Sequence, residues 1–331
     1  MARSVLPDLD TAALELLNQT LAAARLFTGF TDPTSGVAAL VARRTYRVGD
    51  DGALLPSDEP WPIFSEPLQT DVGVFPSDMT PAHAGCDLVI AGIARSIEPV
   101  TSLAVSASVG AFSTSLQIIG HRVWQERDGE LVPSEPEPFT EMPLGWAAAY
   151  GGVSDHEGMP APYPLNAEGK GFYLKREQAN GRPLPNLEWP HAPTRAWDGR
   201  PLPACWGPVA DPLTWHLAKV SVEMQQSDKA MDRLEERVFI SACQPDLIMP
   251  PLAGGEEVVL TGVAAQPTRF HLPAAALRVR AEIGADRIEA QLAVSGLWIL
   301  LAQRLVVVTW RGGFQYTFRQ HEERRATLLD T

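Results

Sequence analysis

The sequence predicts a mainly β protein whose antiparallel sheets pack as a sandwich or an open barrel, with a loop-rich central insertion and few short helices. Short runs of β-branched and apolar residues, bounded by turn residues, recur towards both ends of the chain. The 26 glycines and 29 prolines favour turns and long connections over long helices. Much of the tryptophan lies in the irregular middle of the sequence, where large rings can pin loops.

In the N-terminal part, the first strand signal is Val37–Val48, which lies between two turn-forming stretches. Leu88–Arg95 and Leu103–Val109 follow as further strands. Ser113–Glu126 has the pattern of one long antiparallel strand with a wet face. The turn sequence Arg127–Glu130 comes next, so we expect a hairpin there.

Two segments favour helix, Leu9–Leu21 and Ser227–Glu236. In the second segment Ser227 can cap the first turn, and apolar residues follow at helical spacing.

Strand signals return from Arg237 onward, with turn residues between most of them. The expected strands are Val258–Gly262, Leu277–Ile283, Arg287–Val294, Leu297–Leu301, Leu305–Trp310 and Phe314–Phe318. We therefore expect an N-terminal β region over 1–132, a Pro/Gly/Trp-rich central lobe over 133–236 and a C-terminal β region over 237–331. The first and third regions are expected to form one domain.

The formal net charge of −13 argues against nucleic acid and anionic membrane surfaces as partners. The pairs Arg43–Arg44 and Arg324–Arg325 are too short to form a basic patch and are interpreted as solvated residues. No segment is apolar for long enough to span a bilayer, and no secretory signal is visible at the N-terminus.

The three cysteines, Cys86, Cys205 and Cys243, are scattered along the chain. This spacing predicts neither a disulfide framework nor a zinc site, and it favours a reduced, cytoplasmic compartment. Cys86 and Cys243 have apolar neighbours, so we interpret them as buried, inert thiols. No metal or other cofactor is expected.

Two groups of polar residues were weighed as reactive sites. Asp78 and His83 could form an acid/base couple of a hydrolase, but Asp78 follows Pro76–Ser77 and is better explained as a turn former. Asp155–Glu157 holds three ligand-type residues, which are interpreted as a solvated loop tip rather than a metal site. We therefore assign no catalytic residue.

The rings of the central lobe are the best candidates for a binding surface, because Trp and Tyr are frequent at binding hot spots. The candidates are Trp146, Tyr150, Trp189, Trp197 and Trp206. Two alternatives stay open. The rings could pack the lobe internally, or they could line up as a platform of a carbohydrate-binding module.

The order of several short motifs, from about Val41 to Gly312, resembles the bacterial type VI secretion adaptor family known as domain of unknown function 2169. The matching stretches are Pro60–Pro62, Gln69–Val72, Phe75–Met79, Asp87–Gly92, Gly120–Trp124, Pro138–Leu144, Ala149–Gly152, Pro164–Phe172, Leu184–Glu188, Trp206–Pro208, Gly254–Glu256 and Thr309–Gly312. The segment Trp215–Arg237 departs from the family pattern, being shortened and altered.

The resemblance implies function by binding rather than catalysis. Family members are similar in acting as cytoplasmic adaptors or chaperones that stabilise an effector protein and help to load it onto the secretion spike. The implied partners are a type VI effector and the VgrG spike, the PAAR tip protein or both. No catalytic residues are carried over from the family.

Overall fold

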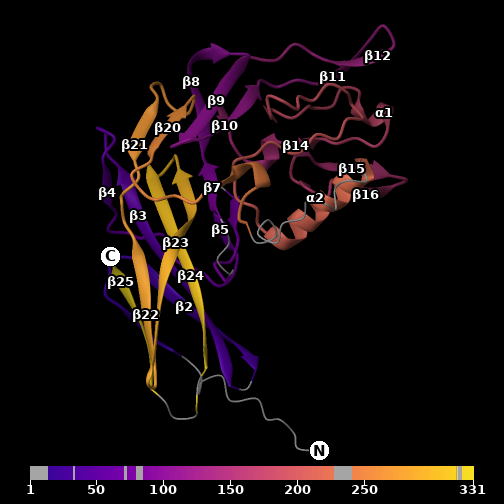
Figure 1. The fold of residues 1–331 in the computed structure, drawn as a ribbon. Helices are drawn as coiled ribbons and strands as arrows, with labels where there is room; N and C mark the ends of the chain where they lie inside the picture. Colours follow the sequence, from indigo (N-terminus) through magenta and orange to yellow (C-terminus); the bar gives the residue numbers. More distant parts are fainter. Residues whose placement is uncertain are drawn as a thin grey trace, which may run out of the picture.

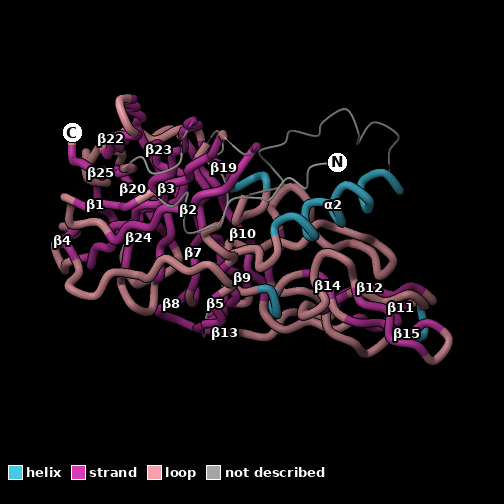
Figure 2. Tube along the Cα trace, turned by 90° about the horizontal axis from the view of Figure 1, so that it is seen from below, coloured by secondary structure: helices cyan, strands magenta, loops and turns pink. Residues whose placement is uncertain are grey.

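The computed structural model describes residues 14–32, 34–70, 73–79, 85–226, 241–317, 319 and 323–331. The chain is mainly β, as the sequence predicts, and forms a curled half-barrel sheet with several smaller sheets beside it (Figure 1). A lobe built from the middle of the chain projects from one side of the half-barrel (Figures 1 and 2).

The half-barrel sheet contains ten described strands from both ends of the sequence. Its main path runs through β1 (Glu15–Asn18), β25 (Arg324–Asp330), β22 (Leu277–Ile283), β23 (Asp286–Leu300), β24 (Leu305–Thr317), β3 (Ser35–Val48) and β2 (Ala23–Asp32). Beside this path, β4 (Leu54–Pro56) pairs with β3, β7 (Cys86–Ala91) pairs with β23, and β19 (Ile248–Met249) pairs with β7. The central strand β3 pairs with β24 along its whole length, so residues near the two ends of the sequence are adjacent.

Four strands predicted separately near the C-terminus are halves of two long strands. Arg287–Val294 and Leu297–Leu301 lie in β23, where the register shifts between Val294 and Gly296. At this irregularity β23 changes neighbours: its first half pairs antiparallel with β22 and its second half pairs parallel with β7. The large sheet is therefore mixed rather than purely antiparallel.

The second sheet has five described strands in the order β18 (Leu187–Glu188), β10 (Phe112–Ile119), β9 (Ser102–Val109), β20 (Glu257–Thr261) and β21 (Thr268–His271). The long strand expected over Ser113–Glu126 is wrong, because β10 ends at Ile119 and β11 (Trp124–Arg127) begins a new hairpin with β12 (Glu130–Pro133). The predicted turn between β11 and β12 is confirmed, with positive φ at Asp128 and Gly129.

Smaller two-stranded pairs complete the β structure. β8 (Ile93–Val100) pairs with β13 (Phe139–Pro143), and β5 (Leu68–Thr70) pairs with β6 (Gly73–Phe75). In the lobe, β14 (Tyr150–Gly151) pairs with β17 (Lys170–Gly171), and β15 (Val153–His156) forms a hairpin with β16 (Met159–Pro162).

The longest described helix is α2 (Pro212–Gln226), and the four-residue α1 (Arg176–Ala179) is a single turn. Asp211 caps α2 by accepting the backbone N–H of Thr214 at 3.1 Å, and Pro212 occupies the first turn, where its missing N–H costs nothing. The helix predicted over Leu9–Leu21 is wrong in its described part, which contains β1. The helix predicted over Ser227–Glu236 lies outside the described residues. None of the helices in the described part of the chain has the length and apolar character needed to cross a membrane.

One large apolar cluster extends from the half-barrel sheet into the five-stranded sheet. The lobe has two smaller clusters of its own, one around Tyr150, Phe172 and Trp215 and the other around Trp124 and Leu184. The described part of the lobe therefore has apolar clusters that are rich in aromatic rings.

Candidate functional site

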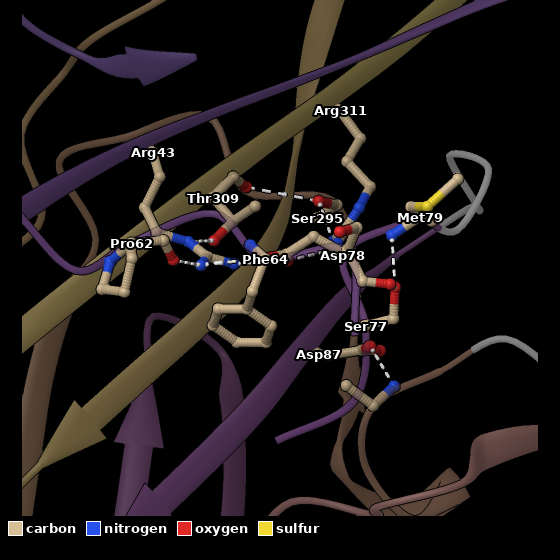
Figure 3. A network of polar contacts seen from close by, with 12 residues as sticks. Arg43, Pro62, Phe64, Ser77, Asp78, Met79, Asp87, Ser295, Thr309 and Arg311 are labelled. Atoms are coloured by element: carbon tan, nitrogen blue, oxygen red, sulfur yellow. Dashed lines mark hydrogen bonds and ion pairs between the residues drawn. The ribbon is translucent and has the colours of Figure 1, made fainter. Parts of the chain in front are cut away.

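A concentrated group of polar side chains lies inside the protein, where Pro62, Phe64 and Asp78 lie beside β3 and β24 of the half-barrel sheet (Figure 3). Arg43 comes from β3, which has a neighbouring strand on each side, and its side chain is completely buried. Its Nε donates to Thr309 Oγ1 at 3.0 Å, because Arg43 and Thr309 are directly paired on β3 and β24. The guanidinium also lies over the Trp298 ring, 4.4 Å from the ring centroid.

Asp78 is the centre of this group and is 1% exposed. Its Oδ1 accepts hydrogen bonds from Nη2 of Arg43 at 2.6 Å and from Nη2 of Arg311 at 3.0 Å. Its Oδ2 accepts from Nη1 of Arg43 at 3.1 Å and from the backbone N–H of Phe64 at 3.1 Å. The carboxylate of Asp78 therefore accepts four hydrogen bonds from within the protein. Arg43 donates two of them in the bidentate geometry typical of strong ion pairs.

Arg311 comes from β24 and links the network to a second buried acid. Its Nη1 donates to Ser295 Oγ at 3.1 Å. Asp87 on β7 attracts Arg311 and accepts the backbone N–H of Ala242 at 2.6 Å. Two buried arginines thus face two buried aspartates, and their formal charges balance.

Burial and ion pairing act in opposite directions on the arginines. Burial lowers the pKa of Arg43 to about 10, while the attraction of Asp78 works against this decrease. Burial likewise lowers the pKa of Arg311, opposed by Asp78 and Asp87. Arg43 therefore keeps its charge at neutral pH, and the network connects β3, β7 and β24 with Pro62, Phe64 and Asp78.

This network links strands that are distant in the sequence. The carboxylate of Asp78 at its centre is buried, and it accepts hydrogen bonds from Arg43, Arg311 and the backbone of Phe64. The three cysteines are buried and unpaired, as the sequence predicts for Cys86 and Cys243, and burial raises the pKa of each thiol, in Cys205 to about 12. Such thiols are poor nucleophiles at neutral pH.

A buried histidine joins the lobe to the same region. His216 on α2 is 1% exposed, and its Nε2 lies 3.3 Å from the carbonyl oxygen of Ser241. Burial lowers its pKa to about 4, with the Ser241 carbonyl and Asp87 acting in the opposite direction. The imidazole is therefore neutral at physiological pH.

Two sequence interpretations of these residues are wrong. Arg43 was expected to be solvated, and so was Arg324, but both are buried. Asp78 was explained as a turn former, whereas it binds two arginines that are distant in the sequence. A signal for Arg43 was present, since it directly follows the apolar run Val37–Ala42, where a buried charge needs a partner.

The five rings chosen from the sequence have different surroundings. Tyr150, Trp189 and Trp206 are buried, and the first two also donate hydrogen bonds to the backbone carbonyls of Gly199 and Pro203. Trp146 and Trp197 are half-buried, with Trp146 donating to the Pro208 carbonyl at 2.8 Å. The structure divides the five rings between the main core and both clusters of the lobe. Contact between these rings and a partner stays a prediction.

The other candidates are placed as follows. His83 lies outside the described residues, so the couple of Asp78 and His83 is not described. Asp155, His156 and Glu157 form the exposed end of the β15–β16 hairpin, where Asp155 accepts the backbone N–H of Gly158 at 3.1 Å. Within the described ranges, no group of three or more His, Cys, Asp or Glu side chains is positioned to hold a metal ion.

Fold and site together define a half-barrel β protein with a ring-packed lobe, stabilised inside by a balanced network of ion pairs. Residues 34–311 match the model of a family described as an uncharacterized protein conserved in bacteria, DUF2169, and the chain belongs to this family. No curated protein and no solved structure gives a significant match.

Proposed function

We propose that this protein is an adaptor of bacterial type VI secretion, which binds an effector protein in the cytoplasm and helps to load it onto the VgrG spike or its PAAR tip. Membership of DUF2169 and the resemblance of its ordered motifs support the proposal. The burial of the Asp78 network supports the proposal as well, because a substrate in solution has no access to these charged groups.

The observation that carries the proposal is the apolar surface of α2. The inner face of this helix buries Trp215 and Val222 in the lobe. On the other side, Leu213 and Leu217 are 56% and 52% exposed, one helical turn apart. Exposed leucines at this spacing are the anchors with which a helix occupies an apolar groove of a partner.

Secretion by the native bacterium tests the proposal. Deleting the gene is expected to abolish type VI-dependent secretion of the effector that co-purifies with this protein, and the wild-type chain is expected to restore that secretion. A chain with Leu213→Lys and Leu217→Lys is expected to fold normally, because both side chains point to solvent, but to fail in rescue.

Leu55→Lys is the matched control, since Leu55 is an exposed leucine on β4 of the half-barrel. It should rescue secretion fully. Unchanged secretion after deletion of the gene would refute the adaptor function. Full rescue by the double lysine variant would refute the role of α2 while leaving the adaptor function standing.

A further inference from the structure

A cleft of about 630 Å³ opens between the half-barrel sheet and the five-stranded sheet. One wall is made by the turn 49–52 and the β23–β24 turn around 301–305. The lining also includes the connection 263–267 and the start of β21, and β8 contributes Ile93 and Arg95. None of these residues takes part in the hydrogen bonds of the Asp78 network.

The floor of the cleft is apolar. Phe270 and Ile299 are buried beneath it, and Val48, Leu301 and Leu305 are half-buried side chains that pack against the main core while lining the cleft. A volume of this size is within the range of about 300–1,000 Å³ that holds a drug-sized molecule, and such sites are mostly apolar with a few polar groups.

The rim carries three arginines, each more than half exposed. Arg95 Nε pairs with Glu141 Oε1 at 3.0 Å, and Arg269 Nη1 pairs with Glu257 Oε1 at 3.1 Å. Arg304 Nη1 pairs with Asp50 Oδ1 at 2.8 Å. Each ion pair occupies one nitrogen, and a guanidinium has five N–H donors on three nitrogens, so each arginine keeps donors for a further acceptor.

The nearby carboxylates balance the charges of these arginines, but they leave several guanidinium N–H donors unused. Glu141 and Glu257 lie outside the cleft lining. Of the two acids in the lining, Asp51 accepts the backbone N–H of Ala53 within its own turn, and Asp50 is paired with Arg304. Arg95 and Arg269 therefore face the cleft without an opposing acid in its lining.

We propose that this cleft binds an amphipathic small-molecule anion, with an apolar body against the floor and one carboxylate at the arginine rim. The apolar floor supplies affinity through burial, and the unused N–H groups of the guanidinium groups donate hydrogen bonds to the carboxylate. This site is independent of the adaptor function and of the α2 surface.

Calorimetric titration of the full chain with decanoate tests the proposal, with decanol and decyltrimethylammonium as probes of the same chain length. We expect saturable binding of one decanoate, weaker binding of decanol and no binding of the cation. Arg304→Gln and Arg95→Gln are each expected to weaken decanoate binding about tenfold, as for the loss of one charge-assisted hydrogen bond, without changing decanol binding.

A second set of variants tests the location. Ala302→Trp places a ring at the cleft from an exposed lining position and should abolish binding, with Ala264→Trp as the alternative if the first variant does not fold. Ala285→Trp, at an exposed alanine in the β22–β23 turn, is the control and should bind decanoate normally. Absence of saturable binding, equal binding of the cation, or normal binding by folded Ala302→Trp and Ala264→Trp would each overturn the proposal. A peptide acid such as N-acetyl-Leu-Val-Leu binding where decanoate does not would overturn it as well.

Discussion

At the scale of residues, the half-barrel depends on one carboxylate shared by two arginines. Arg43 and Arg311 come from neighbouring strands and point to the same face of the sheet, where Asp78 lies between them. A buried ion pair adds little net stability against an apolar replacement, but removing one partner leaves a buried charge without compensation. A substitution of Asp78 should therefore show how much the network contributes to the free energy of unfolding.

Asp78→Asn is expected to lower the free energy of unfolding by about 3–5 kcal/mol, because two guanidinium groups would stay buried beside a neutral amide. Urea denaturation followed by tryptophan fluorescence measures this loss. Glu257→Gln is the matched control: it breaks the exposed pair with Arg269 and should cost less than about 1 kcal/mol. Equal effects of the two substitutions would contradict the central role of Asp78.

His216 makes stability depend on pH in a defined direction. Its pKa in the folded protein is about 4, below the ordinary value of 6.5, so between these values the unfolded chain binds more protons than the folded one. Stability is therefore complete above pH 6.5 and is lost as the pH falls towards 4.

Replacing His216 with Gln, which keeps a donor for the Ser241 carbonyl, should remove this part of the acid sensitivity. The difference in unfolding free energy between wild type and variant should change by up to about 3 kcal/mol between pH 7 and pH 4. Unfolding experiments at a series of pH values measure it. Parallel curves for the two proteins would show that His216 is not the group responsible.

At the scale of elements, the sequence predicted where strands lie better than it predicted which of them join into one long strand. Leu277–Ile283 was predicted with the bounds of β22, and the hairpin at Arg127–Glu130 was predicted from its turn residues alone. Local patterns are sufficient for such elements, because the alternation of apolar and polar residues and the turn-forming residues are visible in a short stretch of sequence. The predicted strands join into the long strands β23 and β24 because these pair with β7 and β3. Both partners are distant in the sequence, so a local pattern does not show the pairing.

The candidate site was less predictable for the same reason. Ring content identified the lobe as ordered, but three of the five chosen rings are buried, since a sequence does not show which side of a ring is covered. Asp78 and Arg311 are 233 residues apart in the sequence, so their pairing could not be read from spacing. The start of α2 did carry a local signal, because Asp211 and Pro212 form a typical helix N-terminus.

Gly120 lies directly after β10, where the backbone around Glu137 approaches closely. A Cβ atom at this position would lie 1.8 Å from the carbonyl oxygen of Glu137, so the backbone of the next segment occupies the space of a side chain. Gly120→Ala is expected to lower the midpoint of thermal unfolding and to cost about 3 kcal/mol.

Gly145→Ala is the control for this substitution, because a Cβ there has no neighbour within 4 Å and its φ of −108° suits any residue. It should stay within about 0.5 kcal/mol of the wild type. A tolerated Gly120→Ala would mean that the segment around Glu137 can move away from β10.

At the scale of the whole molecule, the half-barrel is completed only when the last part of the chain is in place. The described strands β22, β23, β24 and β25 all follow residue 276, and β3 has β24 as its neighbour along its full length. The ion-pair network has the same property, since Asp78 precedes its partner Arg311 by 233 residues. Contacts of this range close late in folding, because the entropy of a long loop is lost before they form.

Cutting the chain between the exposed residues Ala265 and Gln266 should therefore leave two pieces that fold only together. The piece 1–265 alone lacks the partner of β3 on one side and should be sensitive to protease, with no cooperative thermal transition. Co-expression with 266–331 should restore both protease resistance and a sharp transition, because β3–β24 pairing and the Arg311–Asp78 ion pair form without a covalent link. Arg311→Leu in the second piece should weaken that reassembly, while Arg287→Leu, at an arginine that is 80% exposed, should leave it unchanged. A cooperative transition of 1–265 by itself, at the temperature of the intact chain, would show that the sheet does not need its C-terminal strands.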